Sequence, residues 1–398
     1  MTAAQHATGT SPHAAEVRRR LPLLDVLRGV AILGTLMTNV WIFTGPGAEW
    51  GVFEAGLPDA TSSGSLAHVA ETVFRVLADG KFLSLLTVLF GAGLAIQYAS
   101  AERRGLPWPG RYPRRALFLF AEGTVHFVLV FAWDVLMGYA VTALVVARLL
   151  TRTGRAQRRI MAWAGGIHVS LMVLLTAALV LGGNASRAVS PEAIELYANG
   201  GYLEQVAFRL NNALVLRMEP VFTFFLLLFL FFLGTRLFRA GAFVLDDTGR
   251  RIRLRLLAWG LGVGVPLTVA ATLAGPDYFL LGRYVAAPFV ALGYLALIGL
   301  AVERFARRGR HLRPLAALGR MALSGYVLQN LLCVLACYGI GLGLAARLDG
   351  WQPWWTMGLW AVVSAVLIVG ANLWLRRFAQ GPLEALQHRI LTPRRNRT

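Results

Sequence analysis

The chain has 398 residues, of which 57% are hydrophobic and only 15% are charged. Soluble domains carry about 25% charged residues, so this composition excludes an ordinary soluble protein and indicates a polytopic membrane protein in a lipid bilayer. The formal net charge is +19 at pH 7, but the basic residues are spread between apolar stretches, and we infer no nucleic-acid partner from them.

Ten apolar stretches predict ten membrane-spanning helices, because about 20 helical residues cross the hydrocarbon core of a bilayer. They cover residues 22–44, 67–99, 113–133, 134–150, 160–182, 220–239, 255–275, 284–303, 315–345 and 355–376. The second stretch is expected to break near Gly80. The predicted fold class is therefore an all-α transmembrane bundle over residues 21–378, with no separate soluble domain.

The distribution of charged residues predicts the topology of the chain. Segments assigned to the inner side hold 31 arginines, whereas segments on the outer side hold seven basic residues. The acidic residues show the opposite distribution, with six inside and 12 outside. This positive-inside bias predicts that both termini are cytoplasmic. We expect residues 1–20 to be a disordered cytoplasmic tail and residues 379–398 to be a basic cytoplasmic tail.

Two long segments are predicted on the outer side, residues 45–80 and 183–219. The first is rich in glycine and acidic residues, and the second contains Ser190 followed by Pro191 and Glu192. These three residues are typical of a helix start, because they supply a cap, a fixed φ and a carboxylate at the positive helix end. We therefore expect one or two interfacial helices in the second segment.

The first span carries a polar stripe. Asp25 and Arg28 are three residues apart, so they can pair on one helix face. Asn39 lies eleven residues beyond Arg28, about three turns, and returns to that face. The stripe would place an ion pair at the inner mouth of a binding site and an amide near its outer end. The alternative is that the Asp–Arg pair only fixes the register of the helix.

The third span carries two ionisable groups inside its apolar run. Glu122 and His126 are four residues apart and share a helix face, and Asp134 follows at the outer rim. Such groups are costly in hydrocarbon and usually face a bundle interior or a wet cavity. His126 is a candidate general base whose tautomer is held by Glu122 or Asp134, with Glu122 better placed within the helix. The alternative is a structural histidine hydrogen-bonded across the bundle.

Lys81 is the only lysine of the chain and opens the second half of the second span. A lysine retained among 38 arginines suggests a need for a compact or titratable charge, such as the stabilisation of an oxyanion. A snorkelling interfacial lysine is the alternative. Gly91 and Gly93 in the same span are expected to allow close helix packing.

The ninth span places Tyr326, Asn330, Cys333 and Cys337 on one stripe. Tyr326 and Asn330 are candidate substrate-binding residues, although polar groups of this kind often hold helices together instead. The two cysteines are the only ones in the chain and lie in an apolar run, so we predict neither a disulfide nor a metal site.

Five motifs in this order resemble the YeiB-type family of bacterial integral membrane proteins. They are LDVLRGVAILGTLMTN (24–39), KFLSLLTVLFGAGL (81–94), the arginine-led helix with His126 and the tail Asp134–Val135–Leu136, GRMALSGYVLQ (319–329) and WLRRFAQGPLEALQHRILT (374–392). The chain has Trp133 where the family usually has glycine, which would narrow the outer mouth. The resemblance implies a multi-pass protein of the bacterial inner membrane.

The family is distantly similar to membrane acyltransferases, including those that acetylate lysosomal glucosaminide and cell-surface sugars. In that wider group an asparagine at the end of the first helix, here Asn39, and a histidine serve acyl transfer from cytoplasmic acyl-CoA. The resemblance thus implies acyl-CoA as co-substrate and a small-molecule or glycan acceptor at or beyond the outer face. Arg28, Arg114 and Arg115 at the inner end would meet the phosphates of acyl-CoA.

Two other interpretations remain open at the level of the sequence. The same ionisable stripe would suit a transporter or exporter of a lipid, peptide or small molecule, where it would relay protons or substrate. Alternatively, the chain would be a membrane scaffold whose polar side chains only pack helices together.

Overall fold

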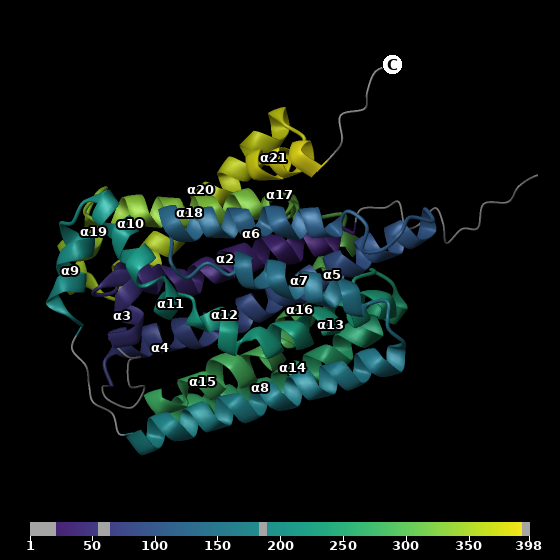
Figure 1. The fold of residues 1–398 in the computed structure, drawn as a ribbon, viewed down its shortest axis with the longest axis horizontal. Helices are drawn as coiled ribbons and strands as arrows, with labels where there is room; N and C mark the ends of the chain where they lie inside the picture. Colours follow the sequence, from purple (N-terminus) through teal and green to yellow (C-terminus); the bar gives the residue numbers. More distant parts are fainter. Residues whose placement is uncertain (1–20, 55–63, 183–188, 392–398) are drawn as a thin grey trace, which may run out of the picture.

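The computed structural model describes residues 21–54, 64–182 and 189–391, and every regular element in those ranges is a helix (Figure 1). The predicted tail 1–20 lies outside the described residues. The long helices run roughly along the longest axis of the molecule (Figure 1). The chain is therefore a helical membrane protein, as its composition predicted.

The predicted spans fall on long helices or on pairs of helices. These are α2 (Pro22–Thr44), α4 (Leu66–Ala78) with α5 (Lys81–Arg103), α6 (Tyr112–Leu129), α7 (Leu136–Leu149), α8 (Gly154–Gly182), α13 (Phe224–Ala240), α14 (Asp247–Leu273), α16 (Ala287–Arg307), α17 (Arg313–Arg320) with α18 (Ala322–Cys337), and α20 (Trp354–Arg377). Six helices in the described part of the chain are long and apolar enough to cross a membrane, or seven if α17 and α18 form one bent span. The count of ten spans and the cytoplasmic termini stay predictions.

Shorter elements connect these helices. They are α3 (Ala48–Glu54), α9 (Pro191–Ala198), α10 (Tyr202–Asn211), α11 (Ala213–Leu216), α12 (Met218–Phe222), η1 (Pro276–Tyr278), α15 (Phe279–Leu281), η2 (Gly282–Ala286), α19 (Leu344–Arg347), η3 (Asp349–Trp351) and α21 (Pro382–Leu391). The predicted helix start at Ser190 is confirmed, since α9 begins at Pro191.

Burial separates central helices from peripheral ones. In the most apolar 18-residue stretch of each helix, the share of buried residues is 61% in α2 and 56% in the α4–α5 pair. The corresponding share is only 17% in α14 and 22% in both α8 and α20. Helix α2 contacts α5, α17, α18 and α20, which places it at the centre of the bundle (Figure 1). The exposed apolar faces of α8, α14 and α20 are what lipid would cover.

The predicted break near Gly80 is confirmed. Helix α4 ends at Ala78, α5 begins at Lys81, and Gly80 between them has a φ of 75°. Glycine is required there for a second reason, because a Cβ on Gly80 would lie 2.2 Å from the carbonyl oxygen of Arg283. The break therefore presses the start of α5 against the turn that precedes α16.

A buried ion pair joins α3 and α10. The Nε and Nη2 atoms of Arg209 on α10 donate to the two carboxylate oxygens of Glu49 on α3, at 2.8 and 3.0 Å. The hydroxyls of Tyr197 and Tyr338 donate to the same carboxylate. Burial alone would lower the pKa of Arg209, but the Glu49 carboxylate raises it above its ordinary value. Burial also raises the pKa of the Tyr197 hydroxyl. This cluster fastens the predicted outer segments to each other.

Helix α21 lies within the predicted tail 379–398, against α6 and α18 (Figure 1). The side chain of Glu384 fixes it there, because its carboxylate accepts hydrogen bonds from the backbone N–H groups of Leu323 and Ser324, at 2.8 and 3.3 Å. The Ser324 hydroxyl donates to the same carboxylate at 2.5 Å. A carboxylate at the start of α18 also interacts favourably with the positive end of the helix dipole.

Candidate active site

The end of α6 brings a histidine and an aspartate together. Helix α6 ends at Leu129, and the N–H groups of Val130 and Phe131 both donate to the carbonyl oxygen of His126. The chain then turns back, so that Oδ2 of Asp134 lies 2.9 Å from Nδ1 of His126. Both side chains are almost fully buried. A tight turn at the helix end thus builds the pair.

The surroundings of Asp134 hold it as an oriented carboxylate. Its Oδ1 atom accepts from the N–H of Leu136 at 2.9 Å, at the positive end of α7. Its backbone carbonyl accepts from Nη1 of Arg217 at 2.8 Å. Because a carboxylate only accepts, Nδ1 of His126 carries the proton, and Nε2 is left with a lone pair. That is the tautomer a general base needs.

Two amides continue the chain of polar contacts beyond His126. The Nδ2 atom of Asn330 on α18 lies 3.3 Å from Nε2 of His126. The Oδ1 atom of Asn330 accepts from Nδ2 of Asn39 on α2 at 3.4 Å. Four predicted site residues, Asp134, His126, Asn330 and Asn39, therefore form one polar row across α6, α18 and α2. The row begins in the buried core and ends at Asn39, which is partly exposed.

Glu122 does not take the position expected of it. Both of its carboxylate oxygens are buried, and neither has a hydrogen-bond partner in the described part of the chain. The expectation that Glu122 would be the better-placed partner of His126 is wrong, because Asp134 returns to the imidazole after α6 ends. A buried carboxyl group without a partner is costly in hydrocarbon, so Glu122 remains a candidate functional group.

A cavity of about 220 Å³ leads from the arginine-bearing ends of α2 and α6, the predicted inner side, toward this row. Its inner part is lined by Tyr112 and Arg115 of α6, and its deep part by Leu136 and Tyr326. The ring of Tyr326 lies 5.3 Å from the ring of His126, centroid to centroid. The Tyr326 hydroxyl is buried without a hydrogen-bond partner among the described residues. Tyr326 therefore links the lining of the cavity to the imidazole of His126.

Arginines surround the inner part of the cavity. Arg28, Arg115 and Arg320 line it, and Nη1 of Arg28 lies 3.5 Å from Asp25, which confirms the predicted pair. Arg114 is exposed and is not among the lining residues. Glu384 and Gln387 of α21 also line the cavity, so the C-terminal helix forms part of its inner wall.

Lys81 lies in a different cavity from His126. The residues around Lys81 come from α4, α14 and the turn before α16, and none of them is shared with the cavity described above. The structure therefore does not bring Lys81 to the imidazole, and its predicted part in stabilising an oxyanion there has no geometric support. Within the described residues, no group of three or more His, Cys, Asp or Glu side chains is arranged to hold a metal ion.

Several residues of the site carry no signal in the sequence. Arg217, which holds the Asp134 backbone, and Glu384, which caps α18, contact partners 83 and 61 residues away. Trp133 donates from Nε1 to the carbonyl oxygen of Glu49 at 2.9 Å, so it ties the end of the α6 turn to α3. Contacts of this kind depend on which helices become neighbours, and spacing along the chain does not reveal that.

The fold and the polar row define a helical membrane protein with a buried His–Asp pair. Residues 237–394 match the family model described as "Protein of unknown function (DUF418)". The chain is similar to the uncharacterized protein YxaH of Bacillus subtilis (strain 168), at 28% identity over 92% of this chain and 93% of that protein. It is also similar to the uncharacterized protein YeiB of Escherichia coli (strain K12), at 29% identity over 92% and 95%. The resemblance found in the motifs is confirmed: the chain is similar to YeiB and YxaH over most of its length, and its C-terminal part matches the DUF418 model.

Proposed function

We propose that the protein is a membrane acyltransferase, which moves an acyl group from cytoplasmic acyl-CoA to an acceptor at or beyond the outer face of a bacterial inner membrane. One observation carries this proposal: the cavity that begins among inner arginines ends at Tyr326, beside the His126–Asp134 pair. Arginines at the entrance of a cavity that reaches a buried general base suit a substrate that carries phosphates at one end and a reactive thioester at the other.

The inner residues would hold the donor. Arg28, Arg115 and Arg320 would meet the phosphates of acyl-CoA at the mouth, and the thioester arm would enter between Leu89 and Leu136. A volume of about 220 Å³ suits a short acyl group on its arm, with the nucleotide remaining outside. The hydroxyl of Tyr326 would donate a hydrogen bond to the carbonyl oxygen of the thioester.

The polar row would then perform the transfer. Nε2 of His126 takes the proton of an acceptor hydroxyl or amine, whose oxygen or nitrogen attacks the thioester carbonyl. The imidazolium that forms is stabilised by Asp134, 2.9 Å from Nδ1. When the carbon–sulfur bond breaks, the imidazolium returns the proton to the departing thiolate of CoA. The acceptor would arrive past Asn39, whose amide is the partly exposed end of the row.

The test uses purified full-length protein in lipid nanodiscs, with acetyl-CoA and a panel of sugars, alcohols and amines. Release of the CoA thiol and the mass of the acylated product are measured together. We expect transfer by the wild type and its loss in His126→Gln. The matched control is His168→Gln, because His168 is equally buried but bonds the carbonyl of Tyr284 on the other side of the bundle. Full turnover by His126→Gln would remove that residue from the mechanism.

Transport is a second candidate function, and one observation favours it. Helices α17 and α18 meet at a bend of 88° beside the cavity, at Met321. Broken helices of this kind often form the binding sites of transporters. Proteoliposomes separate the two functions, because flux of a lipid, peptide or small molecule without a covalent acyl product would support transport and contradict acyl transfer.

A further inference from the structure

Lys81 has a buried charge that the site around His126 does not use. Its side chain is only 3% exposed, and it forms no hydrogen bond or ion pair within the residues that the structure describes. It opens α5 directly after the break at Gly80. A buried ammonium group without a protein partner is costly, so a binding partner from outside the chain would stabilise it.

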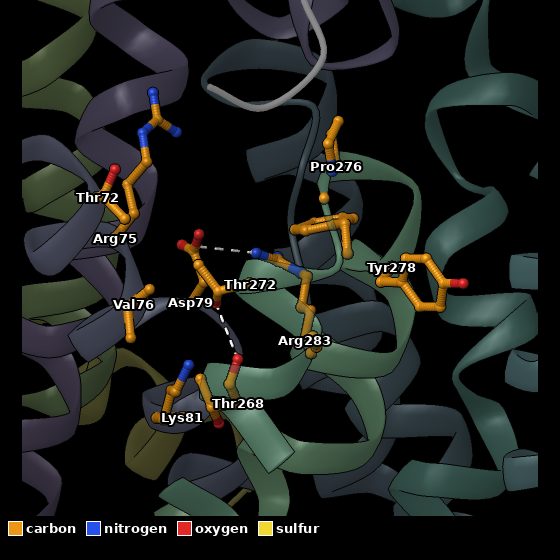
Figure 2. A pocket seen from close by; sticks show the side chains of 14 residues that line it. Thr72, Arg75, Val76, Asp79, Lys81, Thr268, Thr272, Pro276, Tyr278 and Arg283 are labelled. Carbon is orange, nitrogen blue, oxygen red and sulfur yellow. Dashed lines mark hydrogen bonds and ion pairs between the residues drawn. The ribbon is translucent and has the colours of Figure 1, made fainter. Parts of the chain in front are cut away.

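A second cavity, of about 90 Å³, surrounds this ammonium group (Figure 2). Its walls are Thr72, Arg75 and Asp79 of α4, the end of α14 with Thr268, and Arg283. Figure 2 shows the nitrogen of Lys81 directed toward the Asp79–Arg283 pair. The hydroxyl of Thr72 is buried without a hydrogen-bond partner in the described part of the chain. The side chain of Lys81 and the side chain of Thr72 therefore line the same small space.

The charges around the cavity favour an anion. Three cations line it, Arg75, Lys81 and Arg283, against the single carboxylate of Asp79. Nε of Arg75 lies 2.8 Å from the carboxylate of Glu71, which does not line the cavity. The guanidinium of Arg283 lies 3.4 Å from the carboxylate of Glu219 and 4.0 Å from that of Asp79. Lys81 forms no such ion pair among the described residues, although the Asp79 carboxylate lies on the same side of the cavity and acts on its charge. Among the residues that line the cavity, three cations therefore stand against one carboxylate, which favours a ligand that brings a negative charge.

The position of the cavity indicates the chemistry around that anion. Apolar side chains of α4 that do not line the cavity are exposed, with Leu66, Val69 and Val73 at 75%, 50% and 51%. On α14, Val269 and Leu273 are 45% and 65% exposed. The cavity therefore lies between two helices whose outer faces are apolar, at the end of α5 opposite its arginine-rich terminus. A ligand there meets positive charge and apolar surface at one place.

We propose that this cavity binds a phosphate group, with Lys81 as its direct ligand and the Thr72 hydroxyl as a second donor. A phosphate brings one to two negative charges and several acceptor oxygens, which match an ammonium, a hydroxyl and a nearby guanidinium. The group comes from a phospholipid headgroup or from free phosphate, and both sources present the same oxygens to the site. The inference is independent of acyl transfer, because the two cavities share no residue.

The test compares three samples of full-length protein: nanodiscs of zwitterionic lipid, the same nanodiscs with added inorganic phosphate, and nanodiscs containing phosphatidylglycerol. Thermal stability is measured in each sample, and native mass spectrometry counts retained lipid. We expect phosphatidylglycerol to be retained by the wild type and its retention to fall about tenfold in Lys81→Met. A gain in stability with inorganic phosphate but not with phosphatidylglycerol would identify free phosphate as the source.

Matched variants separate binding from folding. Arg347→Met removes an exposed basic residue of the predicted outer side and should leave retention unchanged. Thr72→Val removes the unpartnered hydroxyl without changing the charge, so it should weaken retention even if Lys81→Met folds poorly. Equal response of the wild type, Lys81→Met and Thr72→Val to both phosphate sources would overturn the proposal.

Discussion

Nδ1 of His126 lies 2.9 Å from Oδ2 of Asp134, although α6 ends between them and they are eight positions apart in the sequence. The pair is built by local chain geometry, because the turn after α6 is anchored on the carbonyl oxygen of His126 itself. A change in the turn would therefore move the carboxylate and the imidazole relative to each other. The tautomer of His126 is the property most sensitive to that arrangement.

Asp134→Asn is expected to lower acyl transfer by about 100-fold or more. The amide would donate to Nδ1 of His126, which would move the ring proton to Nε2 and remove the lone pair that accepts the acceptor's proton. The product is measured by mass spectrometry at saturating acetyl-CoA. Asp79→Asn serves as the control, because it removes a carboxylate from the other cavity. Equal rates for Asp134→Asn and the wild type would show that the tautomer does not matter.

Glu384→Ala is expected to loosen α21 from the inner wall of the cavity. The substitution leaves the N–H groups of Leu323 and Ser324 without their side-chain acceptor, which costs about 1–2 kcal/mol for a helix cap. Limited proteolysis should then cut the C-terminal helix faster than in the wild type. Glu102→Ala, at an exposed acidic residue near the end of α5, should leave the cleavage rate unchanged. Equal cleavage of all three proteins would contradict a fastening role for Glu384.

The sequence predicted contacts within a helix better than contacts between helices. Asp25 pairs with Arg28 as the spacing predicted, and Asn39 joins the polar row, because helical periodicity decides which residues share a face. Periodicity does not decide which faces meet. The placement of Lys81 away from His126 depends on the packing of α5 against other helices, and the pairing of Glu49 with Arg209 joins segments 160 residues apart.

The Glu49–Arg209 pair allows a test of the buried cluster that Glu49 forms with Arg209, Tyr197 and Tyr338. Removing one partner leaves a buried charge uncompensated, so Arg209→Met is expected to lower stability by about 3–5 kcal/mol. The double variant Glu49→Gln/Arg209→Met should recover part of that loss, since neither charge remains. Thermal unfolding in detergent compares the single and the double variant with the wild type. Glu71→Gln, which breaks the partly exposed pair with Arg75, should cost no more than about 1 kcal/mol. A similar cost at both pairs would mean that Glu49 is not the anchor of the cluster.

Gly91→Ala is expected to force α5 and α13 apart. A Cβ on Gly91 would lie 2.1 Å from the carbonyl oxygen of Phe231, which confirms the predicted close packing there. At Gly93 the prediction is wrong, because the nearest atom to an added Cβ is Nη2 of Arg28, at an ordinary 3.7 Å.

The methyl group at Gly91 meets backbone, which cannot rotate away, so the variant should lose about 1–3 kcal/mol of stability despite the better helix propensity of alanine. The control is Gly262→Ala on α14, where an added Cβ meets nothing within 4 Å. Thermal unfolding should therefore show a lower midpoint for Gly91→Ala and an unchanged or higher one for Gly262→Ala, and equal midpoints for the two variants would mean that the helices do not approach this closely.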